Sequence, residues 1–431
     1  MIISKLPNFN FRVIINLLLS ILPLSFIAGN LIINLNITLI IIVSLIFWGR
    51  EFFKIDILLI DKLIIFLFFF STLTSLINFN NFFSSDPYLA KENLIKSFTF
   101  IRYLFFYFSI RLIIEKDYFD IKTFFIFSGI CVIFVSLDLI LQFYSGKDIF
   151  GFPKAHHKLS GPFGDELIAG SYLQRFCLFL FFLIPFYKNL FSKRNLILIL
   201  LLLFILIFFS VVIAGNRMSV ILLMMLFVFL FLNEKQLRKF VIILVPLILI
   251  LFFTLYKFYP NIKEMTDHFL TLSLEIIFSL DEIYNNPNLD FSNMYLKEFH
   301  LGYMTWKENI IIGVGINSFY LNCKINYDIC TSHPHNYYLE ILSELGIIGI
   351  CVVSIIFVKL LHIYFKIKNN FNLSYENNVI TAFVLLLFVE MFPLKTTGSF
   401  FTTGNASYIF LLIATIVGLS NKFINYKKNQ F

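Results

Sequence analysis

The chain has 431 residues, of which 59% are hydrophobic and only 14% carry a charge. Soluble domains carry roughly a quarter charged residues, so this composition excludes an ordinary soluble protein and indicates one embedded in a lipid bilayer. The net charge of +8 is not gathered in a basic run interleaved with aromatic residues, which excludes nucleic-acid binding as the main activity.

Apolar stretches that come near or exceed the length of a membrane span recur along the chain. One span needs about 20 predominantly apolar residues. The first stretch is followed directly by the second without a small-residue cleavage site, so we interpret it as a retained helix and not as a signal peptide. We therefore predict an all-α polytopic membrane protein with about 12 transmembrane helices, at residues 9–28, 31–48, 57–77, 94–114, 120–144, 166–187, 195–214, 217–232, 239–257, 336–365, 379–393 and 402–420.

The Lys and Arg residues between these stretches fall mainly in alternate connections. Eighteen lie in one alternating set of connections and six in the short connections of the other set. Cytoplasmic loops carry an excess of Lys and Arg, so we expect a bacterial inner-membrane protein with both termini in the cytoplasm. The large hydrophilic segment 258–334 and the shorter one at 145–165 then face the periplasm.

Two of the five cysteines, Cys323 and Cys330, lie in the large outer segment with six residues between them. An oxidising compartment allows them to form a disulfide. Two free thiols are the alternative, and the sequence leaves both open. Cys131, Cys177 and Cys351 lie within apolar stretches and are interpreted as small buried hydrophobic residues. No Cys/His spacing typical of a metal site occurs, so no metal is expected.

Residues 195–232 are nearly continuously apolar and are interrupted only by Gly215-Asn216-Arg217. Two helices must therefore join in a tight hairpin with Arg217 at its outer tip, because Gly and Asn tolerate the positive φ that such a turn needs. Arg217 either extends to the lipid headgroups or forms an anion site, because its planar fork matches phosphate and it lies at a helix N-terminus. Its place on the cation-poor side favours the anion site.

Further arginines lie within apolar stretches, where ionisable groups are costly and mark candidate functional sites. Arg175 lies in the outer half of the stretch 166–187. Two or more arginines near the outer leaflet would suit a diphosphate. Arg111, near the cytoplasmic end of its stretch, is interpreted as an anchor, and Arg102 as a residue that packs against a neighbouring helix.

A second polar signal, residues 332–349, closes the outer segment and opens a span. Asn336 is a good helix-start residue. Histidine is the side-chain type best suited to proton transfer near neutral pH. His335, which is preceded by His333, is therefore a candidate catalytic base, and Glu340 is a carboxylate that could orient it. The alternative is that the histidines only provide hydrogen bonds at a helix terminus.

Upstream of these histidines, residues 306–312 predict a short amphipathic helix, and the glycines at 313 and 315 predict a turn after it. The Gly-Val-Gly sequence lacks a third glycine and a preceding strand, so it does not indicate a nucleotide-binding loop.

These separated motifs together resemble the O-antigen ligase and polymerase family of bacterial inner-membrane proteins. The shared domain of that family ends in the signature H-N-x-x-L-x-x-x-x-x-x-G, which here runs from His335 to Gly346. The other matching pieces, in order, are Leu159–Gly164 with Gly170–Leu173, Ala214–Arg217, Ile312–Phe319 and Lys395–Phe401. We therefore expect a ligase-like domain at 146–420, preceded by N-terminal helices at 1–145 and followed by a cytoplasmic tail at 421–431.

The resemblance implies a glycosyltransferase of the membrane-embedded, lipid-carrier-dependent type that needs no metal or other cofactor. Such an enzyme takes a glycan from undecaprenyl diphosphate on the periplasmic side and passes it to an acceptor hydroxyl. The acceptor is lipid A-core for a ligase and a carrier-linked glycan for a polymerase. The resemblance further implies that Arg217 holds the diphosphate and that His335 activates or positions the acceptor. With Glu340 orienting His335, we expect a single displacement.

The sequence departs from the family at one point. Many members carry an arginine a few residues before the tryptophan of the large outer segment, and here His300 and residues 301–303 occupy that stretch. Either His300 replaces that arginine as a phosphate or acceptor contact, or Arg175 or Lys395 supplies the cation. His333 and Asn336 are further candidates for such contacts.

Two alternatives to the ligase remain. The spacing of the closing motif and the moderate size of the outer segment favour a ligase over a polymerase. A twelve-helix transporter also fits the composition, but transporters usually contain internal repeats, and the two halves of this chain show no convincing similarity. The concentration of polar motifs in the outer segment also favours chemistry at the membrane surface.

Overall fold

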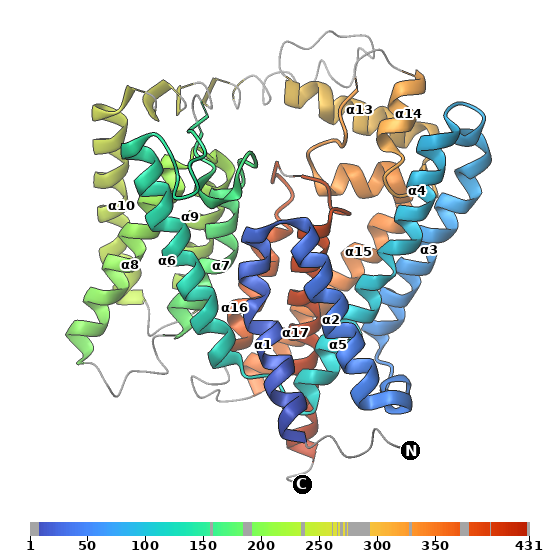
Figure 1. Cartoon of the computed structure of the whole chain (residues 1–431), viewed down its shortest axis with the longest axis horizontal. Coiled ribbons are helices and arrows are strands. Elements are labelled where there is room, and N and C mark those ends of the chain that lie inside the picture. Colours follow the sequence, from blue (N-terminus) through green and yellow to red (C-terminus); the bar gives the residue numbers. More distant parts are fainter. Residues whose placement is uncertain are drawn as a thin grey trace. The chain divides into compact units, whose positions relative to one another are not determined.

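The computed structural model describes residues 8–155, 158–183, 192–233, 238–260, 262–264, 266–267, 270–271, 274, 294–326, 330–370, 379–396 and 398–428. The named elements in these ranges are all helices (Figure 1), which confirms the predicted all-α class. The chain forms two compact units. Unit 1 consists of Met1–Leu39, Tyr118–Ser273 and Leu373–Glu390, and unit 2 of Ile40–Asp117, Leu274–Asn372 and Met391–Phe431.

Unit 1 is a group of helices built around α6 and α7. Phe125 of α6 stacks on Phe179 of α7 with ring centroids 5.1 Å apart, and Phe179 lies 5.1 Å from Phe383 of α16. Figure 1 shows α6, α7, α8, α9 and α10 side by side. The elements of the unit are α1 (Asn8–Ala28), the beginning of α2 (Asn30–Trp48), α6 (Ile121–Ser145), η2 (Gly161–Phe163), α7 (Ala169–Leu183), α8 (Lys193–Ile213), α9 (Arg217–Asn233), α10 (Arg238–Phe258) and α16 (Val379–Glu390).

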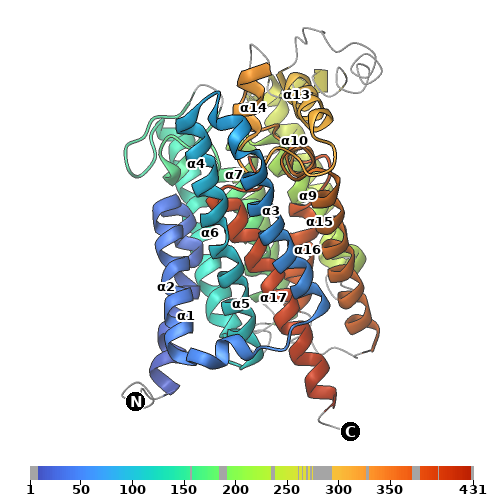
Figure 2. The same cartoon turned by 90° about the vertical axis from the view of Figure 1, so that its right-hand side faces the viewer.

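Unit 2 is built around a long contact between α5 and α17, which run together in Figure 2. This close approach needs a small residue, because a Cβ added to Gly418 would lie 3.2 Å from the carbonyl oxygen of Arg111. As expected, Arg102 packs against a neighbouring helix, and its guanidinium lies 3.4 Å from the hydroxyl of Thr403. The elements are η1 (Gly49–Lys54), α3 (Leu59–Phe83), α4 (Pro87–Phe100), α5 (Arg102–Glu115), α13 (Met294–Glu308), α14 (Phe319–Asn326), α15 (Tyr337–Asn370) and α17 (Thr403–Lys428).

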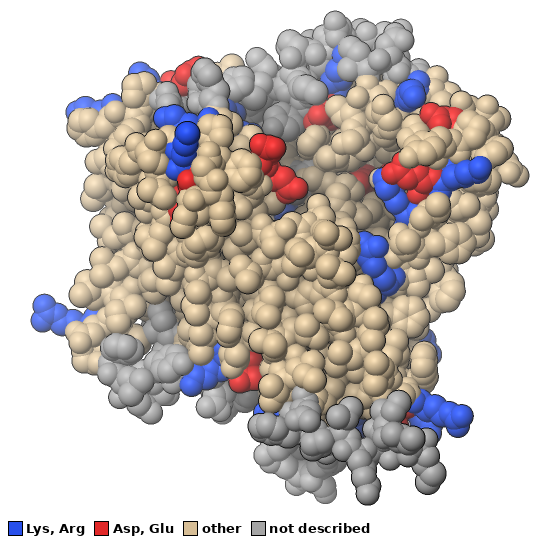
Figure 3. All heavy atoms as spheres, viewed as in Figure 1, with Lys and Arg blue, Asp and Glu red and all other residues tan. Residues whose placement is uncertain are grey.

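Within the described residues, eight of the twelve predicted stretches lie in helical segments that are long and apolar enough to cross a bilayer. The other four stretches correspond to shorter apolar helices of 10–17 described residues in α7, α9, α10 and α16. One of these eight segments, which includes the stretch 94–114, consists of two consecutive helices: α4 and α5 meet at Ile101, whose amide donates to the carbonyl of Phe98 three residues back and so tightens the helix locally. The surface of the helices in Figure 3 is mostly uncharged, as expected for helices that contact lipid tails.

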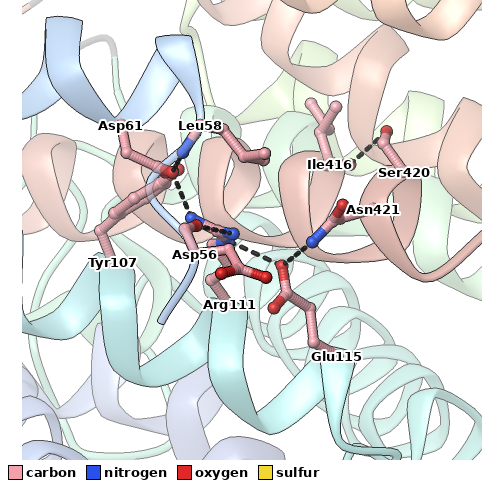
Figure 4. Close-up of polar contacts among 9 residues, drawn as sticks. All are labelled: Asp56, Leu58, Asp61, Tyr107, Arg111, Glu115, Ile416, Ser420 and Asn421. Carbon is pink, nitrogen blue, oxygen red and sulfur yellow. Dashed lines mark hydrogen bonds and ion pairs between the residues drawn. The ribbon is translucent and has the colours of Figure 1, made fainter. Parts of the chain in front are cut away.

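A buried ionic network ties α5 to α3 and α17 (Figure 4). The Arg111 side chain is fully buried and pairs with Asp61, which is also fully buried, and with Glu115 at 2.7 Å. It also donates to the carbonyl of Asp56 at 2.9 Å, while Asn421 of α17 donates to Glu115 at 2.8 Å. The interpretation of Arg111 as a simple anchor at the helix end is therefore wrong. The carboxylates of α3 and of its own helix allow the guanidinium to be buried.

Candidate functional site

The hairpin that presents Arg217 forms as predicted. Helix α8 ends at Ile213, Gly215 adopts a φ of +75°, and α9 begins at Arg217. The side chain of Asn216 ties the turn to the preceding motif by donating to the carbonyl of Leu167 at 2.9 Å. A Cβ at Gly170 would lie 2.8 Å from the Cβ of Asn216, so only glycine permits this approach. The first two motif pieces therefore meet in unit 1.

Arg217 lines a cavity of about 240 Å³ in unit 1. The cavity is otherwise apolar apart from one hydroxyl, and its other lining residues are Val212, Gly215, Val220, Ile221, Phe252, Ile262, Thr266 and Leu270. A guanidinium next to apolar walls suits a ligand with an anionic group and a hydrocarbon chain, because the cation pairs with the anion and the walls bury the chain.

Arg175, the second predicted diphosphate-binding residue of unit 1, is engaged by a carboxylate. Its Nη2 and Nε atoms lie 2.6 and 3.1 Å from the two carboxylate oxygens of Glu390, which is fully buried at the end of α16. The charge of Arg175 is thus balanced, and binding a diphosphate would require breaking this bidentate pair. The pair instead bridges α7 and α16. Sequence reasoning missed Glu390, although a carboxylate inside an apolar stretch was itself a signal.

His335 belongs to unit 2 and has a strained backbone. Its φ is +51°, a left-handed value that costs a non-glycine residue about 1–3 kcal/mol and is often found at functional sites. Asn336 fixes the chain immediately after it. Its side-chain oxygen accepts from the amides of Tyr338 at 3.0 Å and Leu339 at 3.2 Å, and its amide group donates to the carbonyl of Pro393 at 2.7 Å.

The predicted helix start at Asn336 is therefore confirmed, since α15 begins at Tyr337. The side chain of Asn336 forms structural hydrogen bonds at this position. Its predicted role as a substrate contact stays a prediction.

The carboxylate that lies against His335 is Glu298 and not Glu340. Glu298 Oε1 is 3.4 Å from His335 Nε2. The buried Glu340 instead accepts from the amide of Phe400 at 2.5 Å and so holds the last loop of unit 2. The expectation that Glu340 orients His335 is corrected for this reason: its Oε2 atom is bound by the backbone at Phe400, and the carboxylate next to His335 is that of Glu298.

Helix α13 brings Glu298 to His335. One turn after Glu298, a Cβ added to Gly302 would lie 2.9 Å from the Cβ of Pro334, so the absence of a side chain lets α13 lie close to the histidine segment. Glu298 is 3% exposed, and this burial raises its pKa to about 7. No motif in the sequence marks Glu298, because its role depends on a contact between residues far apart in the chain.

The other predicted contacts of unit 2 lie around this pair or in the adjoining loop. The rings of His333 and His335 are 4.2 Å apart. Burial, and then the charge of His335, lower the pKa of His333 to about 4, so His333 is neutral at neutral pH. His300 is buried on α13, and the buried Lys395 places its ammonium group 5.2 Å from the ring of Tyr337. Arg217 and Arg175 belong to the other unit.

The glycine turn at 313–315 packs backbone to backbone against α15. A Cβ at Gly313 would lie 2.3 Å from the carbonyl carbon of Glu344, and a Cβ at Gly346 would lie 2.3 Å from the carbonyl oxygen of Ile311. Both glycines have positive φ, +74° and +61°. The carboxylate of Glu344 completes the contact by accepting from the amide of Asn317 at 2.8 Å. The predicted turn is confirmed, and it joins two of the matching motifs.

The predicted amphipathic helix at 306–312 is wrong in its position. Helix α13 ends at Glu308, and the following residues are not helical. The carbonyl of Ile310 instead accepts from the amide of Ile347 at 2.9 Å, so contact with α15 replaces the hydrogen bonds of a continuing helix.

A disulfide joins Cys323 of α14 to Cys330. Cys323 is buried against Leu301 and Phe319, so the bond attaches the chain that leads to the histidines to α13 and α14. Cys131 and Cys177 are buried as expected, but Cys351 is exposed on α15, so its interpretation as a buried residue is wrong.

Residues 202–354 match the family model described as O-antigen ligase. The matched range includes Arg217, Glu298 and His335, and it confirms the predicted resemblance over these residues. A search of curated proteins found no match to the chain.

Proposed function

Because residues 202–354 match the O-antigen ligase family model, we propose that the protein transfers a glycan from undecaprenyl diphosphate to an acceptor hydroxyl at the periplasmic face. The acceptor in this proposal is lipid A-core. The observation that carries it is the apolar cavity lined by Arg217, which has the chemical character expected of a site for a lipid that bears phosphate.

Arg217 binds the diphosphate in this proposal. Its planar guanidinium can donate two parallel hydrogen bonds to phosphate oxygens, and its place at the first residue of α9 adds the free amides and the dipole of the helix. Negative charge on the diphosphate grows as the bond to the sugar breaks, so the interaction strengthens in the transition state. The apolar walls bury part of the polyprenyl chain, at about 0.8 kcal/mol for each buried methylene.

His335 accepts the proton of the acceptor hydroxyl. The acceptor oxygen forms a bond to the anomeric carbon as the bond from that carbon to the diphosphate breaks, and the electron pair leaves on the diphosphate. Because a diphosphate is a good leaving group, the proposal needs no general acid.

Three features support the orientation and the choice of acceptor. The eighteen cations in alternate connections support cytoplasmic termini and an outward-facing site. The spacing of the closing motif and the size of the outer segment favour a ligase over a polymerase.

A deletion strain distinguishes a ligase from a polymerase on a lipopolysaccharide gel, because loss of a ligase leaves no attached repeat and loss of a polymerase leaves a single attached repeat.

Two substitutions and two matched controls test the proposal. Arg217→Ala and His335→Ala should each abolish glycan transfer while the protein is inserted at normal levels. Arg238→Ala at the start of α10 and His362→Ala on the exposed side of α15 should leave it intact. Near-normal surface glycan in both test variants would refute the assignment, and accumulation of substrate in sealed vesicles without transfer would indicate a transporter.

A further inference from the structure

Glu298 differs from the other buried carboxylates of the described residues in how little binds it. Glu344, Glu340, Asp138 and Asp148 accept hydrogen bonds from backbone amides, and Asp61 and Glu390 pair with arginines. Glu298 is 3% exposed, its Oε1 atom contacts only the imidazole of His335, and its Oε2 atom has no hydrogen-bond partner among the described residues.

A buried carboxyl with so few partners is costly to folding. Burying a polar group without a compensating hydrogen bond is unfavourable in proteins. Among the described residues Glu298 binds no backbone amide, in contrast to Glu344 and Glu340. Its position is instead defined by its one partner, His335, and by the approach of Gly302 to Pro334.

We propose that Glu298 is the positioning residue of the reaction: it binds the Nε2 hydrogen of His335, fixes the imidazole tautomer and stabilises the imidazolium that forms during transfer. This inference rests on the proposed function. It assigns Glu298 a role through the histidine and no contact with either substrate.

Because Nε2 of His335 faces Glu298 at 3.4 Å, the hydrogen lies on Nε2 and the lone pair on Nδ1. The proton of the acceptor hydroxyl moves to Nδ1 as the new glycosidic bond forms. The resulting imidazolium is paired with the carboxylate of Glu298 until its extra proton passes to water, which restores the starting state.

The active form therefore requires two deprotonated groups, neutral His335 and ionised Glu298. Burial raises the pKa of Glu298 to about 7, so Glu298 gains its proton on the acid side of neutrality. Two other titratable groups lie in the segment before α15: His335, which contacts Glu298, and the neutral His333 next to His335. On α13 itself, Lys297 and His300 are close to Glu298 in the sequence. The rate should fall with the second power of proton concentration well below both pKa values.

The test is the pH profile of kcat/KM for Glu298→Gln in the purified full-length protein. Wild type should show a limiting acid slope of two in log kcat/KM against pH. Glu298→Gln should show a slope of one and a rate at least tenfold lower, within the 10²–10⁴-fold range typical of general-base catalysis. Its binding of undecaprenyl diphosphate should not change. Glu308→Gln is the matched control, because Glu308 is on the same helix and bonds to Asn322 instead.

Glu298→Asp keeps the carboxylate. It provides a second test if Glu298→Gln is folded but reacts too slowly to measure. It should retain a slope of two at a reduced rate. A folded Glu298→Gln protein with the wild-type rate and a slope of two would overturn the inference, as would a Glu298→Asp protein that is folded and inactive. If His335→Ala were active, the proposed function itself would fail. An inactive His335→Ala with a normal Glu298→Gln would refute only the role of Glu298.

Discussion

Asn336 makes two kinds of interaction that hold His335 in its left-handed conformation: the cap on α15 and a hydrogen bond to Pro393. Two different substitutions of Asn336 separate their effects. Asn336→Ala removes the cap on α15, worth about 1 kcal/mol, and the hydrogen bond to Pro393 (2.7 Å), worth about another 1 kcal/mol. Asn336→Asp keeps the capping oxygen and loses only the donor. We therefore expect Asn336→Ala to destabilise unit 2 by about 2 kcal/mol and Asn336→Asp by about half of that.

The loss of activity should exceed the loss of folded protein. The φ of +51° at His335 stores about 1–3 kcal/mol, which is comparable to the ties that Asn336→Ala removes. Once those ties are lost, the segment can relax and move the imidazole away from Glu298, so the transfer rate should fall by about tenfold or more. Denaturation in detergent micelles and the initial rate of glycan transfer measure the two effects. An Asn336→Ala protein with the wild-type rate, or an Asn336→Asp protein as unstable as Asn336→Ala, would refute the reasoning.

Three further predictions concern other parts of the structure. Asp61→Ala should cost about 3–5 kcal/mol, because the fully buried Arg111 loses its buried partner, and adding Arg111→Met should restore much of the folded protein in a detergent extraction assay. Gly313→Ala should prevent the turn from packing on α15, because the φ of Gly313 is +74° and the new Cβ would lie 2.3 Å from the backbone of α15. Gly404→Ala should be tolerated, because no atom lies within 4 Å of its new Cβ. Thermal unfolding of the two variants compares their stabilities. Wild type should lose stability as the pH falls from 6.5 to 4, because His333 has a pKa of about 4 in the folded protein and is protonated at higher pH in the unfolded chain. His333→Asn should lose less stability over this range. An unchanged pH dependence of the free energy of unfolding would contradict this.

Local patterns predicted the parts of the site that depend on neighbouring residues. A three-residue break in a long apolar run was enough to predict the hairpin at Arg217, because only a reversal can accommodate it. A capping residue before a new apolar run was enough to predict the start of α15 at Asn336.

Long-range contacts account for the parts that the sequence did not predict. Arg175 and Glu390 are 215 residues apart, and nothing in either segment indicates that they pair. Glu340 is close to His335 in the sequence, but the loop at Phe400 uses its carboxylate. The residues after Glu308 have a helical pattern, but α15 takes up the carbonyl of Ile310. In each case tertiary contacts overrode the local pattern.

The most direct test of the central claim is glycan transfer by the purified protein in a bilayer, with an undecaprenyl-diphosphate-linked glycan as donor and lipid A-core as acceptor. The account predicts that wild type attaches the glycan, and that Arg217→Ala and His335→Ala, folded and inserted, do not. Transfer at the wild-type rate by both variants, or no transfer by wild type to this acceptor or to a carrier-linked glycan, would contradict it.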